Sequence, residues 1–360
     1  MKAIVNTNLN ERTQLPSVNT PTHKYYKPGD EVNIVEIVNG DPYEGNKVWY
    51  KLDNGKYIWS GGVEGIENIT SGLGEIPFSP GDYYWIHDYN IPELWAKGLT
   101  GKGVKVAILD TGISLPHKDL NIEKKNCINV SSEESGNIKD LDGHGTHCAG
   151  IIKASNNGFG VTGVAYDCDL YFGKITSDKF GDSFTRLEKG LEWAIRKKVD
   201  LVSISFGRHI DKINIQTIFQ KVVKNNIIPV CAGGNMIDSV TEEDDILYPA
   251  KYDECISVGA IGRDKKPTLG TLISSALNIG APGTEIKSTT LNNGYEVRSG
   301  TSQAAPYVCG VIALVLQYCK ENGKDYSFKI VKEWLNQYSD NIEGTPFPII
   351  NPLLLFNNLN

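Results

Sequence analysis

The sequence predicts an α/β protein, in which a domain with a mostly parallel central sheet follows a small all-β barrel. Two observations predict this order. Residues 1–72 contain short strand-like segments separated by turn residues, whereas the rest of the chain alternates apolar runs with helical periods. A stretch rich in glycine and proline lies between them. We therefore place the barrel at residues 1–72, a linker at 73–82 and the α/β domain at 83–360.

Several short strands are predicted in the N-terminal region. Residues 32–38 alternate apolar and polar side chains, as a half-buried strand does. Residues 47–52 and 56–59 flank Asp53-Asn54-Gly55, which predicts a hairpin closed by an Asn-Gly turn. Residues 39–42, Asn-Gly-Asp-Pro, predict another turn. Short strands so close together favour a small barrel.

Three segments of this region are Leu9–Arg12, Val48–Leu52 and Tyr57–Val63. Together they resemble the corresponding segments of bacterial SH3-like (SH3b) modules. Such modules bind peptides or cell-wall material, so the resemblance implies a ligand of that kind. The alternative is a folded spacer. Trp49 and Trp59 either line a ligand groove or belong to the core of the barrel.

The second region alternates buried strands with amphipathic helices. Apolar runs predict strands at residues 104–109, 201–205, 227–230 and 255–258. Apolar residues at helical spacing predict helices around residues 187–195 and 215–223. This alternation is typical of a parallel sheet covered on both faces, whose sites lie at the carboxyl ends of its strands.

Composition narrows the classes of partner. The chain has 360 residues and a net charge of −7, without a long basic segment, which argues against a nucleic-acid partner. The longest apolar run, residues 311–316, is too short to cross a bilayer, so we expect no membrane partner. Composition leaves the oligomeric state open.

The cysteines indicate the compartment. There are seven, an odd number, mostly in apolar stretches such as residues 228–232, and none forms a CxxC pair. A zinc or dithiol site therefore has no support. Free buried thiols are typical of a reducing compartment, and the N-terminus shows no apolar signal segment, so we expect a cytoplasmic protein. A secreted protein whose signal has been removed is the alternative.

Two polar residues at element ends are candidates for catalysis. Asp110 ends the first predicted strand, where backbone donors can hold a carboxylate, although a metal ligand or a turn residue also suits that place. His144 lies among small residues that permit close packing of a helix start. His147 follows three residues later, but no glutamate lies between them as in the HExxH metal motif, so we expect a structural role for His147.

Ser302 is the candidate nucleophile. It precedes a long apolar stretch that predicts a buried helix, and it would lie in the first turn, where the helix dipole and free N–H groups favour a developing oxyanion. A helix-capping serine is the alternative. Asn235, at the end of another predicted strand, can donate to the same oxyanion. Arg298, close to Ser302, either faces the leaving group or is solvated.

Four segments together resemble the subtilisin-like serine proteases, the subtilases: residues 108–112, 143–147, 232–235 and 300–306. The chain order Asp, His, Ser fits that family and differs from the chymotrypsin and α/β-hydrolase orders. Over residues 83–358 the resemblance implies a three-layer subtilisin-like fold and a serine endopeptidase. It implies Asp110, His144 and Ser302 as the catalytic triad, with Asn235 as the oxyanion donor.

The resemblance also implies how a protein or peptide substrate is held. The family binds an extended peptide between two backbone edges. The matching residues here are Gly181 on one edge and Ser205, Phe206 and Gly207 on the other. The pocket for the residue before the scissile bond, P1, is implied at Ser205–Gly207 and at Ala232, Gly233 and Gly234. No charged residue occurs there, so we expect an apolar or broad P1 preference.

A structural calcium ion is implied by the loop at residues 155–161. Asn157 and loop carbonyls match the family's ligands, and Asp119 matches its carboxylate ligand. Hard oxygen ligands on a glycine-containing turn suit Ca²⁺. A plain turn with an asparagine is the alternative. No organic cofactor is expected.

The sequence departs from the family pattern in three places. Gly233 and Gln303 replace the more usual alanine and methionine, without loss of a functional group. No folding pro-domain is recognisable, and the SH3-like region stands in its place. Two other functions stay open: a peptide- or cell-wall-binding protein with a latent protease scaffold, and a non-proteolytic acyl hydrolase.

Overall fold

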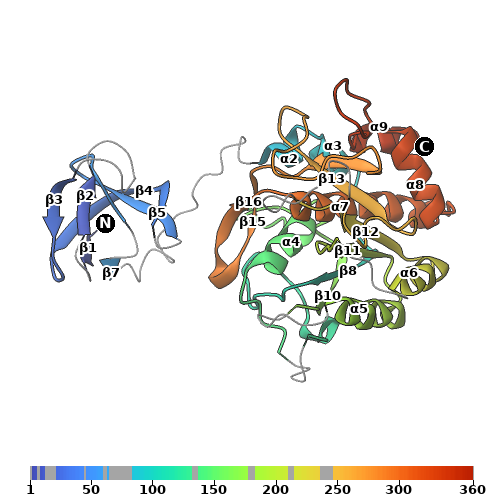
Figure 1. Cartoon of the computed structure of the whole chain (residues 1–360), viewed down its shortest axis with the longest axis horizontal. Coiled ribbons are helices and arrows are strands. Elements are labelled where there is room, and N and C mark those ends of the chain that lie inside the picture. The colour runs from blue at the N-terminus through green and yellow to red at the C-terminus, as the bar shows by residue number, and fades with distance from the viewer. Residues whose placement is uncertain are drawn as a thin grey trace. The chain divides into compact units, whose positions relative to one another are not determined.

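The computed structural model divides the chain into two compact units, Met1–Ile76 and Pro77–Asn360 (Figure 1). The structure describes residues 2–5, 9–12, 22–43, 46–59, 63–64, 83–131, 137–176, 183–209, 215–235 and 246–359. The expected linker, residues 73–82, lies outside these ranges. The SH3-like assignment and the domain boundaries remain predictions.

The first unit is an antiparallel sheet with the strand order β3-β2-β6-β5-β4-β1-β7. Its strands are β1 (Lys2–Val5), β2 (Leu9–Arg12), β3 (Thr22–Tyr26), β4 (Glu31–Tyr43), β5 (Asn46–Leu52), β6 (Tyr57–Trp59) and β7 (Val63–Glu64). The buried side chains include Val5, Tyr26, Val32, Ile34, Leu52 and Ile58. Trp49 is only 1% exposed, so it belongs to the interior, and Trp59 packs against the same cluster.

One of the two predicted turns in this unit is confirmed and the other is wrong. β5 and β6 pair around Asn54-Gly55, and the Leu52 N–H donates to the Lys56 carbonyl. At residues 39–42, however, β4 continues without a turn, and its register against β5 shifts between Asn39 and Tyr43. A bulge of this kind accommodates glycine and a proline without an N–H inside a strand.

The second unit is built on a parallel sheet of seven strands, in the order β14-β13-β12-β11-β8-β10-β9. These are β8 (Lys105–Asp110), β9 (Cys127–Asn129), β10 (Asp169–Lys174), β11 (Leu201–Ile204), β12 (Ile228–Ala232), β13 (Ile256–Ile261) and β14 (Ile279–Pro282). The four predicted strands are confirmed as β8, β11, β12 and β13. The chain leaves β8 toward one edge and later continues on its other side, so β8 lies at the switch point of the sheet.

Helices cover both faces of this sheet (Figure 1). They are α4 (His144–Lys153) and α7 (Thr301–Glu321) on one face, and α5 (Ser183–Lys197) and α6 (Ile215–Lys224) on the other. Val106 and Ile108 of β8 pack in the cluster with α4 and α7, whereas Ala107 and Leu109 pack with α5 and α6. Successive side chains of a strand point to opposite faces, so the continuous apolar run serves two cores.

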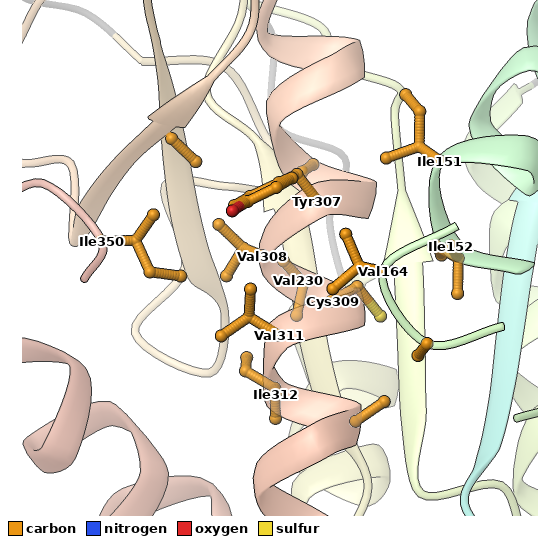
Figure 2. Packing of buried hydrophobic residues seen from close by; sticks show 14 of the residues in the cluster. Ile151, Ile152, Val164, Val230, Tyr307, Val308, Cys309, Val311, Ile312 and Ile350 are labelled. Carbon is orange, nitrogen blue, oxygen red and sulfur yellow. The ribbon is translucent and has the colours of Figure 1, made fainter. Parts of the chain in front are cut away.

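α7 is the central helix of the larger core. Figure 2 shows Tyr307, Val308 and Val311 on this helix, packed beside Ile350 and, on the other side, near Ile151 of α4. α7 has the length and hydropathy of a membrane-spanning helix, but 89% of its apolar window is buried inside the protein. That burial is typical of a core helix.

The remaining α-helices pack in the same core cluster as α4 and α7. They are α2 (Tyr84–His87), α3 (Ile91–Ala96), α8 (Phe328–Gln337) and α9 (Pro352–Asn357). The other elements are two 3₁₀ turns, η3 (Lys124–Asn126) and η4 (Leu291–Asn293), and the antiparallel pair β15 (Ile286–Thr289) and β16 (Tyr295–Arg298). β16 leads directly into α7. Asp110 is the last residue of β8, Ser205 directly follows β11, and Asn235 lies three residues after β12. Because these strands are parallel, the three residues lie at the same edge of the sheet.

Candidate active site

Asp110 and His144 form the best-defined pair at this edge. Asp110 Oδ1 lies 2.7 Å from His144 Nδ1, and the side chains are 2% and 20% exposed, respectively. The Thr111 N–H donates to the same oxygen at 2.7 Å, which orients the carboxylate. Burial alone would lower the pKa of His144, but the Asp110 carboxylate outweighs it and raises that pKa well above its ordinary value.

A glycine allows this close approach. A Cβ on Gly145 would come within 2.3 Å of the Gly112 carbonyl oxygen and 3.2 Å of Asp110 Cβ. The first turn of α4 therefore packs directly on the end of β8. The small residues around His144 have the role that the sequence predicted.

Asp140 is a functional residue that the sequence analysis missed. It is 1% exposed, and its Oδ1 accepts the Gly143 N–H at 3.0 Å and the Thr111 hydroxyl at 2.9 Å. Its Oδ2 accepts the Thr146 N–H at 2.9 Å and the Thr146 hydroxyl. Asp140 thus caps α4 and ties its start to the segment after β8. An acidic residue just before a helix start was the available signal.

His147 has a structural role, as expected. Its Nε2 lies 3.0 Å from the Ile286 carbonyl and 3.2 Å from the Glu296 carbonyl, so its N–H donates to both strands of the β15–β16 pair. Burial lowers the pKa of His147 to about 3, which keeps the ring neutral. A neutral ring that serves as a donor fastens this strand pair to α4.

Ser302 lies in the first turn of α7, as predicted, and a proline four residues later shapes its surroundings. Pro306 has no N–H, so the Ser302 carbonyl lacks its usual helical partner. Two side chains donate to it instead: the Ser205 hydroxyl at 2.9 Å and the Cys148 thiol at 3.4 Å. The backbone of the candidate nucleophile is thereby connected to β11 and to α4.

Cys148 connects the two candidate catalytic residues. Its sulfur lies 3.9 Å from His144 Nδ1 and 3.4 Å from the Ser302 carbonyl oxygen. Within the described part of the chain, no hydrogen bond joins the Ser302 hydroxyl to His144. Such bonds are often long before substrate binds and tighten in the complex.

Asn235 lies beside the start of α7. Its Oδ1 accepts the Thr301 N–H at 3.0 Å and the Thr301 hydroxyl at 3.1 Å. Because its oxygen is held by these two donors, its Nδ2 group remains oriented as a donor. The Gly234 N–H, in turn, donates to the Thr301 hydroxyl at 3.1 Å. These bonds hold the segment after β12 against the turn that carries Ser302.

Arg298 is partly buried and forms ion pairs with two carboxylates. Its guanidinium donates to Asp142 Oδ1 at 3.2 Å and to the Asp142 carbonyl at 3.0 Å, and it also pairs with Glu296. Asp142 Oδ1 accepts the His144 N–H at 3.1 Å. Arg298 therefore connects β16, just before Ser302, to the start of α4.

The expected substrate-binding residues fall into three groups. Ser205, Phe206 and Gly207 follow β11 and are half-buried. Ala232, Gly233 and Gly234 lie at the end of the neighbouring strand β12 and are buried. Gly181 lies outside the described residues. The structure thus brings Ser205–Gly207 and Ala232–Gly234 to the site, whereas Gly181 has no described position.

The expected calcium ligands lie next to each other. Asp119 is fully buried, and its Oδ1 accepts the Asn157 amide N–H at 2.9 Å. Its Oδ2 accepts the Val161 N–H at 2.8 Å and the Tyr295 hydroxyl at 3.2 Å. Burial raises the pKa of Asp119, and these three neutral donors oppose that rise only in part.

Comparison with known proteins identifies the family. A profile of the Subtilase family (Peptidase S8) matches residues 101–344. The chain is 36% identical over 235 residues to the "Major intracellular serine protease" of Bacillus subtilis (strain 168), covering 64% of this chain and 74% of that protein. It is 37% identical over 229 residues to the "Intracellular serine protease" of Paenibacillus polymyxa, covering 63% of this chain and 70% of that protein.

A third relative is "Subtilisin E" of Bacillus subtilis (strain 168), 35% identical over 233 residues, which are 65% of this chain and 60% of that protein. The matched region contains the parallel sheet, α4 and the helix that carries Ser302. The chain belongs to the subtilase family of serine endopeptidases.

Proposed function

We propose that this endopeptidase cleaves peptide bonds through Ser302 as nucleophile, His144 as general base and Asp110 as the residue that orients the imidazole. The observation that carries the proposal is the 2.7 Å hydrogen bond between Asp110 and His144, beside the helix start that holds Ser302. Because Asp110 binds Nδ1, the tautomer presents an unprotonated Nε2 to the serine hydroxyl.

The reaction then follows from these positions. His144 takes the Ser302 proton as the hydroxyl oxygen attacks the substrate carbonyl. The oxyanion that forms accepts the Asn235 amide N–H and the Ser302 N–H at the start of α7. The imidazolium, stabilised by Asp110, then protonates the leaving amine, and water hydrolyses the acyl-enzyme by the same route in reverse.

The test is labelling of the purified protein by a fluorophosphonate, which reacts with an activated serine. The wild type is expected to be labelled, and Ser302→Ala is expected to lose the label. Ser299→Ala is the matched control, because Ser299 is an exposed serine three residues earlier in the same segment. Labelling that survives Ser302→Ala, or that is lost in Ser299→Ala alone, contradicts the assignment.

The calcium site is a second part of the proposal. Asp119 is a buried carboxylate, and within the described residues its partners are neutral donors, so a cation would compensate its charge. The donor chemistry fits Ca²⁺, which prefers carboxylate and amide oxygens. Asn157 now directs its nitrogen at Asp119, so its amide must turn to present oxygen. Bound calcium would stabilise the loop of residues 155–161.

The N-terminal unit has a proposed role in substrate choice, with a peptide or cell-wall polymer as its ligand. The resemblance to SH3-like modules supports this role. Trp49 is buried, so its side chain does not line a ligand surface. Removal of residues 1–72 is expected to alter which proteins are digested but to leave the hydrolysis of short peptides unchanged. An unchanged digestion pattern would favour the folded spacer.

We also propose a cytoplasmic location. Six of the seven free cysteines are buried, as in proteins of reducing compartments. Two of the relatives carry the word "intracellular" in their names. Fractionation of the source cells, followed by fluorophosphonate labelling of each fraction, tests this location.

A further inference from the structure

Two backbone segments border the space beside the candidate nucleophile. One follows β11 and begins with Ser205, whose hydroxyl donates to the Ser302 carbonyl at 2.9 Å. The other ends β12 and includes Gly234, whose N–H donates to the Thr301 hydroxyl at 3.1 Å. β11 and β12 are adjacent parallel strands. These are the two segments at which the resemblance to the subtilases implies the pocket for the P1 side chain.

Leu247 packs against both of these segments. A Cβ added to Gly207 on one segment would come within 2.8 Å of Leu247 Cβ and 2.9 Å of its Cδ1. A Cβ added to Gly234 on the other would come within 2.6 Å of Leu247 Cγ and 2.8 Å of Cδ1. The Leu247 side chain thus contacts both backbone segments, the one after β11 and the one at the end of β12.

Backbone bonds hold Leu247 in this position. The Leu247 N–H donates to the Gly233 carbonyl at 2.9 Å, and the Leu247 carbonyl accepts the Lys251 N–H at 3.0 Å. Its neighbour Tyr248 forms two backbone hydrogen bonds of 2.9 Å with Arg208, the residue after Gly207. Leu247 is only 7% exposed, so its side chain has little freedom to withdraw.

The two glycines serve this packing for different reasons. Gly234 has a φ of +122°, which already favours glycine. Gly207 has no such backbone requirement, so at that position the absence of a side chain makes room for Leu247. A Cβ placed on Gly234 would also come within 2.9 Å of Leu272 Cδ1, so a second apolar side chain packs against this glycine.

We propose that Leu247 fills the P1 pocket and restricts this protease to substrates with a small P1 residue, such as alanine or glycine. The inference rests on the proposed function and names its substrate class. It narrows the apolar or broad preference expected from the sequence. A larger P1 side chain must displace a packed leucine held between two backbone segments, and close-packed sites resist such overfilling.

The test uses tetrapeptide p-nitroanilides that are identical except at P1, where they carry Ala, Val, Leu or Phe. The wild type is expected to hydrolyse the Ala substrate at least about tenfold better than the Phe substrate in kcat/KM, the scale on which apolar pockets discriminate by size. Leu247→Ala is expected to raise the ratio of Phe to Ala hydrolysis by about tenfold or more. Leu335→Ala, which truncates a buried leucine on α8, is expected to leave the ratio unchanged.

Two results overturn the inference. One is a wild type that cleaves the Phe substrate as well as the Ala substrate, and the other is a Leu247→Ala variant with the wild-type ratio. Leu247→Val, a smaller truncation, must shift the ratio in the same direction if Leu247→Ala does not fold. Failure to hydrolyse any of the four substrates, together with no fluorophosphonate labelling, overturns the proposed function instead.

Discussion

The Cys148 sulfur lies 3.9 Å from His144 Nδ1, the same nitrogen that lies 2.7 Å from Asp110 Oδ1. Ligand atoms of Asp110, His144 and Cys148 all lie within 4.8 Å of one another. Asp110 Oδ2 is buried and has no hydrogen-bond partner among the described residues. A thiolate, an imidazole nitrogen and a carboxylate together bind soft or borderline cations.

We therefore expect Hg²⁺ to inactivate the enzyme by binding Cys148 and displacing His144 from Asp110. The measurement is the fraction of peptidase activity lost at increasing Hg²⁺, for the wild type and for Cys148→Ala. The variant should resist inactivation. Cys168→Ala, a change at another fully buried cysteine, should stay sensitive. Equal sensitivity of Cys148→Ala would show that the metal acts elsewhere.

The raised pKa of His144 predicts the acid limit of activity. As the proposed general base, His144 must be neutral to accept the serine proton, so activity is expected to fall as the pH drops through its pKa. Because that pKa is raised, the midpoint of kcat/KM should lie above the ordinary histidine value of about 6.5. Asp110→Asn should lower kcat by roughly 10⁴-fold and move the midpoint to lower pH. If the midpoint of Asp110→Asn equals that of the wild type, the loss of activity at acid pH is due to a group other than His144.

The hydrogen bonds of Asn235 predict the effect of two substitutions. Asn235→Ala should lower kcat by about 100- to 1,000-fold with little change in KM, as loss of an oxyanion donor does. Asn235→Asp keeps oxygen acceptors for the two Thr301 donors but lacks the amide N–H, so its kcat should fall as far as that of Asn235→Ala. If Asn235→Asp retained wild-type kcat, the residue would serve only to hold Thr301.

Calcium should stabilise the fold through Asp119. Adding Ca²⁺ at about 100 times its Kd should stabilise the wild type by about 2.7 kcal/mol, seen as a higher Tm, and a chelator should reverse the shift. Asp119→Asn removes the charge and should abolish the dependence on calcium. Asp169→Asn, at an exposed position at the start of β10, should keep it. A wild-type Tm that does not respond to Ca²⁺ would mean that the neutral donors suffice for Asp119.

Much of the larger unit could be predicted from the sequence because its signals are local. The apolar runs that became β8, β11, β12 and β13 stand between residues of different character, and strands buried on both faces have few alternatives. A site at the carboxyl ends follows from parallel topology. The hydrogen bond between Asp110 and His144, and the structural role of His147, agree with that expectation.

What escaped prediction depends on contacts between distant segments. Asp140 looked like one acidic residue in a loop, because one of its donors is the hydroxyl of Thr111, which lies 29 residues earlier, directly after β8. The position of Leu247 could not be predicted, because the two backbone segments that it contacts, at Gly207 and Gly234, follow other strands of the sheet. The turn predicted at residues 39–42 failed because pairing with β5 outweighed local turn preference and left a bulge instead.

The central position of α7 also bears on when activity appears. Ser302 begins a helix that packs against β11, β12 and β13, and it lies late in the chain. A ribosome makes the strands and His144 first, and domains acquire their structure as complete units. Asp110, Asn235 and Ser302 can therefore meet only after α7 has been synthesised and has packed on the sheet. A nascent chain that stops before α7 lacks the proposed nucleophile.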